Sequence, residues 1–187
     1  MTGRLYRSAA ATGCALALAA TGCGSGTTGT AVPTSSVEAQ PSTAQPASFD
    51  PCTDIPQAIL DAENLANQGP DTSRSGEITW TGCSFRDKQA DGYDVRVVNT
   101  TLTLDQLQKK FADSYRETTF SGRRAAYYAL FPDLGSESCV VNVEMANGTL
   151  EFELYNPEVS SRTGDIPACD LVTDLAEQIV AVIPPGA

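Results

Sequence analysis

The chain has 187 residues, of which 41% are hydrophobic and 7% aromatic, and this length suggests one folded domain with appended segments. Its 23 acidic and 12 basic side chains give a formal net charge of −11, which argues against a nucleic-acid partner because phosphate binding depends on clustered Lys and Arg. The sequence contains no histidine, which excludes a Ser-His-Asp triad and a zinc site built on imidazole ligands.

The first 22 residues have the three parts of a lipoprotein signal peptide. Arg4 and Arg7 precede an apolar run from Ala9 to Ala20, which is shorter than the roughly 20 residues needed to span a bilayer. Ala20-Thr21-Gly22-Cys23 then resembles a bacterial lipobox, in which small residues precede a cysteine that is lipidated and becomes the first residue of the mature protein. We therefore expect a lipid on Cys23 that holds the protein on the outer face of the cell membrane. An ordinary cleaved signal peptide, with Cys23 pairing later, is the alternative.

Residues 23–48 predict a flexible tether. After Cys23 this segment is rich in Gly, Ser, Thr, Ala, Gln and Pro, and Glu38 is its only charged residue. Such a composition does not bury enough apolar surface to offset the entropy of ordering. A flexible chain of this length has an end-to-end distance of roughly 25–30 Å. We expect the folded domain, residues 49–187, to be held a short distance from the membrane.

Four cysteines remain for the domain once Cys14 is assigned to the signal peptide and Cys23 to the lipid. They are Cys52, Cys83, Cys139 and Cys169. An even number in an exported protein predicts a disulfide framework. Three pairings are possible, and we favour Cys52–Cys83 with Cys139–Cys169, because each pair closes a loop of about thirty residues and ties a helix to a strand.

The first half of the domain is predicted as a helix followed by two strands. The helix begins near Pro56 and ends at Gly69-Pro70, and residues 70–76 are predicted as a loop by composition. Residues 77–86 are rich in β-forming residues, and residues 93–98 alternate between apolar and polar side chains, so two strands joined by a polar hairpin loop follow.

A second helix is predicted to begin at Thr103, which forms a capping box with Gln106. Its apolar face follows the helical period. That face consists of Leu104, Leu107, Phe111 and Tyr115. A strand at residues 126–130 follows.

The clearest hairpin lies in residues 141–154, around Asn147-Gly148, which favours a type I′ turn. A turn at these two residues directs six apolar side chains toward the core. The predicted pairs are Met145–Leu150, Val143–Phe152 and Val141–Leu154. The other face carries Glu144, Glu151 and Glu153 and is expected to meet water.

The chain ends in a predicted helix from Cys169 to Ile183. Its apolar stripe consists of Leu171, Leu175, Ile179 and Val182, and Pro184-Pro185 stops it. Runs of antiparallel strands with segregated helices predict an α+β fold, namely an antiparallel sheet of about five strands packed by three helices and held by two disulfides.

A few residues are candidates for binding, and none is a candidate for catalysis. Trp80 can stack on a sugar or a peptide, although packing on a disulfide in the core is the favoured interpretation. Tyr127 and Tyr128 are adjacent on a strand, so one of them is expected to face outward as a contact residue. Arg123 and Arg124 form the densest basic spot of an acidic chain, which suits a carboxylate or a phosphate, although a solvated bend is the default interpretation.

The domain resembles a family of actinobacterial envelope lipoproteins whose shared domain of unknown function opens with Asp-Pro-Cys. The matching landmarks are Asp50-Pro51-Cys52, Trp80-Thr81-Gly82-Cys83 on a strand, Gly122-Arg123-Arg124-Ala125, Cys139 before alternating valines, and Cys169 at the head of the last helix. The resemblance implies an extracytoplasmic lipoprotein, and it brings no catalytic residues to this chain.

These features favour a membrane-anchored, non-enzymatic binding or adaptor module of the cell envelope, whose partner is an envelope protein or a small ligand. One alternative is a carrier for a lipid or another small ligand, with an apolar cavity between sheet and helices. A less favoured alternative is a glycan hydrolase that uses two carboxylates, since this is the acid–base pair that a chain without histidine retains. We expect no metal, no cofactor and no nucleic acid.

Overall fold

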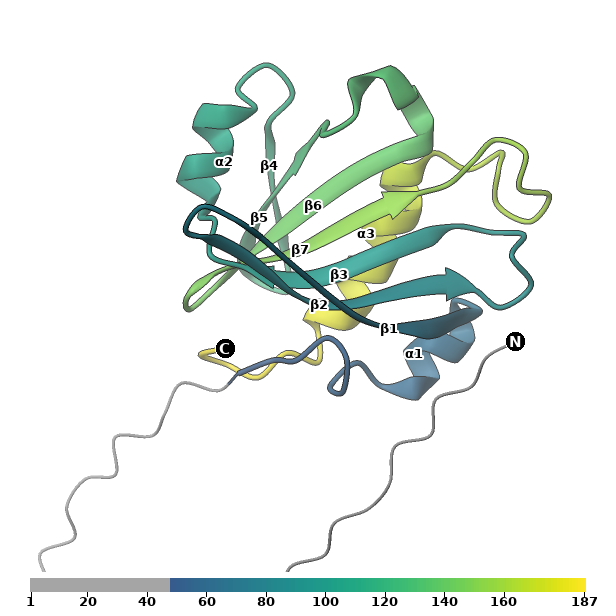
Figure 1. Cartoon of the computed structure of the whole chain (residues 1–187), viewed down its shortest axis with the longest axis horizontal. Helices are drawn as coiled ribbons and strands as arrows, with labels where there is room; N and C mark the ends of the chain where they lie inside the picture. Colours follow the sequence, from purple (N-terminus) through teal and green to yellow (C-terminus); the bar gives the residue numbers. More distant parts are fainter. Residues whose placement is uncertain (1–47) are drawn as a thin grey trace, which may run out of the picture. The chain divides into compact units, whose positions relative to one another are not determined.

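A seven-stranded antiparallel sheet organises residues 48–187, which are the part of the chain that the computed structural model describes (Figure 1). The strand order is β1-β2-β3-β7-β6-β5-β4. The predicted signal peptide, Cys23 and the tether up to residue 47 lie outside the described residues. None of the helices within residues 48–187 is long and apolar enough to cross a membrane.

The elements follow one another along the chain with short connections. They are α1 (Gln57–Ala62), β1 (Leu65–Ser75), β2 (Ile78–Asp87), β3 (Asp94–Thr100), α2 (Leu104–Lys110), β4 (Arg116–Phe120), β5 (Arg123–Tyr128), the 3-10 helix η1 (Pro132–Glu137), β6 (Ser138–Met145), β7 (Gly148–Tyr155) and α3 (Ala168–Val180). The predicted antiparallel sheet with helices is therefore confirmed, but the counts differ, because residues 48–187 form seven strands instead of about five and a 3-10 helix in addition to three α-helices.

β1 is the largest departure from the predicted elements. Residues 65–75 form a strand, where the end of a helix and a loop were predicted. Leu65 is the only fully buried residue of β1, so no apolar alternation marks the strand in the sequence. Gly69-Pro70 is accommodated because β1 is an edge strand with a bulge between Asn67 and Gly69. The consequence is a long β1–β2 hairpin with a polar surface.

The second edge strand, β4, was also not predicted. It pairs with β5 through a turn at Ser121-Gly122, whose φ angles are 47° and 82°. The preceding helix α2 has the predicted capping box, in which the Thr103 side chain accepts from the Gln106 backbone N–H at 3.3 Å. The helix ends at Lys110, so Tyr115 is buried beyond the helix instead of on its face.

The β6–β7 hairpin is confirmed, but its register differs from the predicted one. Met145 pairs with Gly148, Val143 with Leu150 and Val141 with Phe152, so the turn residues are 146–147 instead of 147–148. Gly148 belongs to the strand, and a Cβ there would lie 2.0 Å from the carbonyl oxygen of Thr100. The glycine is thus required by the close approach of the β3 end. Because the shift is two residues, the apolar side chains still face the core as predicted.

The main core lies between one face of the sheet and α3. Leu175 and Ile179 of the predicted stripe are fully buried against strand residues such as Phe85, Val97 and Phe152. α3 ends at Val180, so Val182 lies beyond the helix and is 44% exposed, contrary to its predicted place in the stripe. α1 adds Leu60 and α3 the residues Ala168, Val172, Ala176 and Val180 to the same core.

Both disulfides have the favoured pairing. Cys52 is joined to Cys83 on β2, and Cys139 on β6 is joined to Cys169 in the first turn of α3. The paired cysteines are 31 and 30 residues apart, respectively. One bridge therefore fixes the segment before α1 to the sheet, and the other fixes the start of α3 to the sheet.

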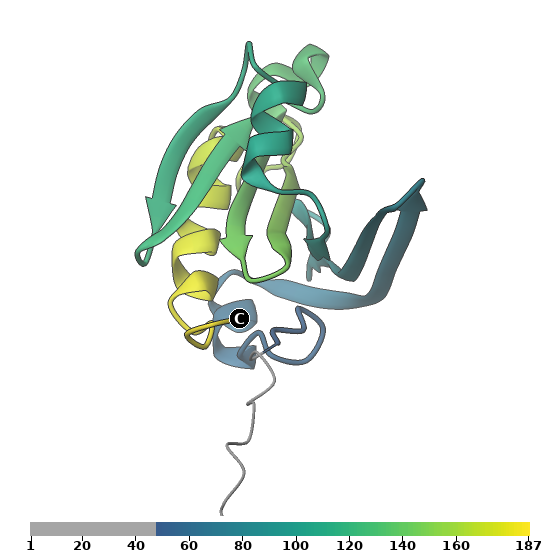
Figure 2. The ribbon, with the colours of Figure 1, turned by 90° about the vertical axis from the view of Figure 1, so that its left-hand side faces the viewer.

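α2 packs on the face of the sheet opposite α3, where it builds a second, smaller core (Figure 1). Leu104 and Leu107 of α2 are buried with Tyr128 and Val140 of the sheet. Figure 2 shows the β1–β2 hairpin bending out of the sheet on the side away from α3. The second face is therefore covered by α2 over β5 and β6 and flanked by the hairpin at the other edge.

Candidate functional site

The part of the second face that α2 leaves uncovered carries polar side chains in rows across the strands. Ser84 of β2, Arg96 of β3 and Glu153 of β7 lie directly opposite one another. In the next row Val98 of β3 is opposite Glu151 of β7. We call the uncovered region around Arg96 and Glu153 the polar groove.

The polar groove consists of two hollows that share Arg96 and Glu153. The larger hollow, about 690 Å³, extends toward Phe131 of the segment before η1 and Tyr155 of β7. The smaller hollow, about 390 Å³, lies between Trp80 of β2 and Phe111 at the end of α2. Both volumes fall in the range of roughly 300–1,000 Å³ that small-molecule sites occupy.

Arg96 is the centre of the polar groove, and its side chain is 20% exposed. Its Nε atom lies 3.0 Å from Asp71 Oδ1 on β1, and its Nη1 atom lies 3.2 Å from Glu151 Oε1 and 3.4 Å from Glu153 Oε2 on β7. Its Nη2 atom donates to Ser73 Oγ at 3.2 Å. One guanidinium therefore holds three carboxylates and ties the β1–β2 hairpin to the middle of the sheet.

Glu151 is buried, with 3% exposure, and its prediction as a water-facing residue is wrong. Its Oε2 atom accepts from the Tyr128 hydroxyl at 3.2 Å and from Asn142 Nδ2 at 3.5 Å. The prediction assumed that the face opposite the main core meets water, whereas α2 and its second core cover this part of that face. Glu153 is half-buried, and of the three glutamates only Glu144 is exposed as predicted.

Burial raises the pKa of Glu151 above its ordinary value of 4.5, and the nearby Arg96 opposes this only in part. Burial and the adjacent Glu151 likewise raise the pKa of the Tyr128 hydroxyl far above its ordinary value, so this hydroxyl remains a donor. Within the network, Asn142 Nδ2 also donates to Thr149 Oγ1 at 2.7 Å, and Thr149 Oγ1 donates to the carbonyl oxygen of Leu102 at 3.0 Å.

The raised pKa of Glu151 makes the stability of the domain depend on pH. The folded state binds the Glu151 proton more tightly than the unfolded state, so this stabilisation is complete at acidic pH and is lost as the pH rises through the folded pKa. Glu151→Gln mimics the protonated form. We expect the free energy of unfolding of Glu151→Gln, relative to that of the unsubstituted protein, to increase as the pH is raised from about 4 to 7. Urea unfolding across this range measures it, and a constant or decreasing difference would contradict the assigned direction.

A family model described as "Protein of unknown function (DUF3558)" matches residues 18–181. The chain belongs to this family. The DUF3558 match includes every strand of the sheet and the whole polar groove. No curated protein and no solved structure was found to match the chain.

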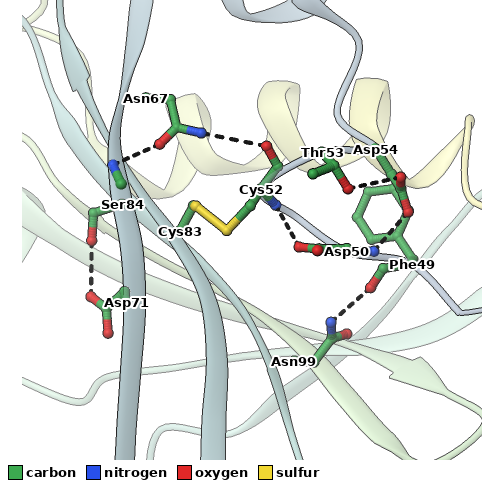
Figure 3. The surroundings of a disulfide bond; sticks show 11 residues. Phe49, Asp50, Cys52, Thr53, Asp54, Asn67, Asp71, Cys83, Ser84 and Asn99 are labelled. Carbon is green, nitrogen blue, oxygen red and sulfur yellow. Dashed lines mark hydrogen bonds between the residues drawn. A yellow bond between two sulfur atoms is a disulfide. The ribbon is translucent and has the colours of Figure 1, made fainter. Parts of the chain in front are cut away.

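The Asp-Pro-Cys landmark of this DUF3558 domain is a structural turn (Figure 3). Asp50 Oδ1 accepts from the Cys52 backbone N–H at 2.9 Å, and the Asp50 carbonyl accepts from the Asp54 N–H at 2.8 Å. Asn99 Nδ2 donates to the Phe49 carbonyl at 2.8 Å. These hydrogen bonds fix the start of the domain against β3 and place Cys52 next to Cys83.

Trp80 lies on the second face of the sheet and lines the smaller hollow of the groove. The predicted packing of Trp80 on a disulfide is wrong, because residues three apart on a strand point to opposite faces and Cys83 faces the main core. Trp80 is half-buried beside Phe111, whose ring stacks on Tyr128 at a centroid distance of 4.3 Å. The tryptophan therefore faces the smaller hollow.

Tyr127 and Tyr128 face opposite sides of the sheet as predicted, but neither is a free contact residue. Tyr127 is half-buried, and its hydroxyl lies 2.8 Å from Thr173 Oγ1 on α3. Tyr128 is buried beneath α2. The layers on both faces of β5 therefore occupy both side chains, which the sequence alone does not reveal.

The two arginines of the predicted basic spot have structural partners in the folded domain. Arg123 donates to the carbonyl oxygens of Ala187 at 2.9 Å and Pro184 at 2.7 Å, so it holds the C-terminal segment. Arg124 is exposed and lies 3.5 Å from Glu117 and 3.4 Å from Glu144. The structure therefore brings neither arginine to the polar groove.

A second buried carboxylate, that of Asp87, has a structural role at the C-terminal end of β2. Burial by itself would raise its pKa, but hydrogen bonds from Asn64, from the backbone N–H groups of Asp91 and Gln89, and from Arg162 outweigh it and lower the pKa. These contacts join the loop after β2 to the segment before α3.

The residues that form the groove centre were missed from the sequence. Arg96 and Glu153 belong to strands that were predicted, but their pairing depends on β3 lying next to β7, which is far away in the sequence. Asp71 was placed in a loop. The one available signal was the recurrence of charge at every second position, as in Asp94 and Arg96 and in Glu151 and Glu153. Within residues 48–187 no group of three or more His, Cys, Asp or Glu side chains is arranged to hold a metal ion.

Proposed function

We propose that this protein is a lipid-anchored lipoprotein of the outer face of the cell membrane, and that its domain is a non-enzymatic binding or adaptor module of the envelope. The observation that carries the proposal is the pairing of all four domain cysteines in two disulfides behind a lipobox-like Ala20-Thr21-Gly22-Cys23. Disulfides of this kind persist in oxidising compartments, which fits an exported protein. The actinobacterial origin that the resemblance implies is part of the same proposal.

The polar groove supports a binding role more than a catalytic one. Its three central carboxylates all bind the same guanidinium, which favours a fixed arrangement of charges over a freely titrating acid–base pair. The groove is also open, and its hollows have volumes in the range that ligand sites commonly have. A partner or ligand that enters it meets aromatic side chains at both ends and hydrogen-bonding groups in the middle.

The anchor is tested by metabolic labelling with a radioactive fatty acid. We expect the full chain to incorporate the label at Cys23 and to partition into the membrane fraction, and we expect Cys23→Ala to abolish both. Cys14→Ala is the matched control, because it removes the other cysteine of the N-terminal segment and should leave the label in place. Absence of label, or label that survives Cys23→Ala, would contradict the anchor.

A carboxylate-dependent glycan hydrolase is the second candidate, and one observation favours it. Glu151, whose pKa is raised by burial, lines the groove together with Glu153 and Asp71, and glycosidases use such an acid beside a second carboxylate. The carrier of an apolar ligand is less well supported, because the side chains between the sheet and α3 pack together as a core and the groove has a charged floor. Products released from an oligosaccharide would distinguish the hydrolase from the binding module.

A further inference from the structure

We propose that the polar groove binds a neutral oligosaccharide, with sugar rings stacked on its aromatic walls and hydroxyl groups bonded to its charged floor. This inference rests on the proposed binding role of the domain, and it names the class of ligand. It follows from three properties of the groove, which are its charge balance, its hydrogen-bonding groups and the placement of its aromatic side chains.

The groove is nearly balanced in charge, although the chain as a whole has about two acidic residues for each basic one. Three basic side chains and four acidic side chains line the two hollows, and most of them are paired with one another. They are Arg86, Arg96, Lys110, Asp71, Asp94, Glu151 and Glu153. A strongly cationic or strongly anionic ligand would therefore find little complementary charge here.

The polar groups of the groove suit hydroxyls, which both donate and accept hydrogen bonds. Asp71 and Glu153 are partly exposed, with side chains 29% and 26% accessible, and each carboxylate has further lone pairs beyond those directed at Arg96. Lys110, at the end of α2, is exposed and supplies donors. A sugar ring, with hydroxyls at several edges, can bond to carboxylate and ammonium groups at the same time.

Aromatic side chains stand at both ends of the groove. Trp80 lines the smaller hollow, where the Phe111 ring is already stacked on Tyr128 and has the Lys110 ammonium over it. Phe131 and Tyr155 line the larger hollow and are 47% and 42% exposed. The C–H face of a sugar ring is apolar and packs on an aromatic ring while its polar edges remain free to hydrogen-bond. Exposed aromatic rings grouped around a hollow indicate a binding surface more than chance exposure does.

The shape of the groove favours a chain of sugars over a single one. The two hollows share Arg96 and Glu153, so Trp80 on one side and Phe131 and Tyr155 on the other flank a polar centre. A linear oligosaccharide can place one ring near Trp80 and another near Tyr155 with its hydroxyls over the centre. Each ring then meets one aromatic wall, and the intervening hydroxyls meet the charged floor.

Fluorescence of Trp80 tests the proposal directly, because it is the only tryptophan of the chain. The full chain, purified in detergent, is titrated with maltohexaose, mannohexaose and chitohexaose, and with spermine as a cationic probe. We expect at least one hexasaccharide to change the emission in a saturable way and spermine to leave it unchanged. If none of the three sugars gives saturation, or if spermine alone does, the proposal is overturned.

Calorimetric titration of variants locates the binding. Glu153→Gln and Tyr155→Ala are expected to weaken binding of the responding hexasaccharide at least tenfold, whereas Glu144→Gln, an exposed glutamate on β6 outside both hollows, is expected to leave it unchanged. Unaltered thermal unfolding of the variants excludes a folding defect. Equal binding by all three variants would overturn the groove as the site.

The sugar-binding experiments and the lipid-labelling experiment test the two proposals independently. Lipid labelling without sugar binding would contradict only the proposed class of ligand. Sugar binding without lipid labelling would contradict only the proposed lipid anchor. Mass spectrometry of the incubated hexasaccharide adds one distinction. Shortened products would confirm the groove as a glycan site and replace the non-enzymatic module with the hydrolase.

Discussion

Replacement of Arg96 by alanine is expected to lower the free energy of unfolding by about 3 kcal/mol, at the lower end of the range for breaking a buried ion pair. The lower end applies because the Arg96 side chain is 20% exposed and water can partly replace it. The loss arises mainly from Glu151, whose side chain is 4% exposed and would stay buried without the cation that Arg96 supplies, at the cost of an unpaired charge or of taking up a proton. Asp71 would also lose its tie to β3, so the β1–β2 hairpin should loosen.

Urea unfolding at pH 7 measures this loss, and a double variant tests its cause. In Arg96→Ala/Glu151→Gln the buried residue is neutral, so we expect a large part of the stability to return. Arg86→Ala is the matched control, because Arg86 bonds to Asp94 on the same face of the sheet but in an exposed pair, and exposed pairs contribute little. An Arg96→Ala loss equal to that of Arg86→Ala, or no recovery in the double variant, would show that Glu151 is not the reason.

Removal of the Cys139–Cys169 disulfide by Cys139→Ala/Cys169→Ala is expected to lower the free energy of unfolding by about 3–4 kcal/mol, according to the chain-entropy model for a loop of this length. The free energy of unfolding of a small domain is about 5–15 kcal/mol in total, so the variant should be marginally stable. The bridge attaches the first turn of α3 to β6, and α3 begins after Pro167 without a side-chain cap. The helix that covers the main core should therefore become the first part of the domain to open.

Hydrogen exchange and peptide mapping test the role of this bridge. The amides of α3 should exchange faster in the variant than those of β2, whereas Cys52→Ala/Cys83→Ala should preferentially loosen the segment before α1 and β2. Mapping of the unsubstituted protein under non-reducing conditions should return the two pairs found in the structure. A different pairing, or a loss below about 1 kcal/mol, would contradict the entropic argument.

The elements that could be predicted are those whose sequence carries a one-sided apolar pattern. β3, α2, the β6–β7 hairpin and α3 have this pattern, and each is present, as is β2, which was predicted from its β-forming residues. β1 and β4 could not be predicted in this way, because edge strands are paired on one side only and much of their surface faces water. Their hydrogen bonds to β2 and β5 compensate for the missing burial.

The candidate site could be predicted less well than the fold, and Glu151 shows why. A charged residue on the face opposite the main core normally meets water, but here α2 closes over this face and buries it with Tyr128 and Asn142. The position of α2 depends on long-range packing that no local pattern contains. The same reason applies to Trp80. Strand alternation determines which face of the sheet its side chain occupies, but the position of α2 determines which residues surround it.

The Cys52–Cys83 bridge determines how the domain responds to mechanical tension. A pull that arrives along the backbone before residue 48 reaches Cys52 within a few residues and passes through a covalent bond into β2. β2 is held by neighbours on both sides, so the load spreads across the sheet while α1, which follows Cys52, is bypassed. The disulfide thus keeps α1 and β1 out of the direct path of a force that acts on the chain before Cys52.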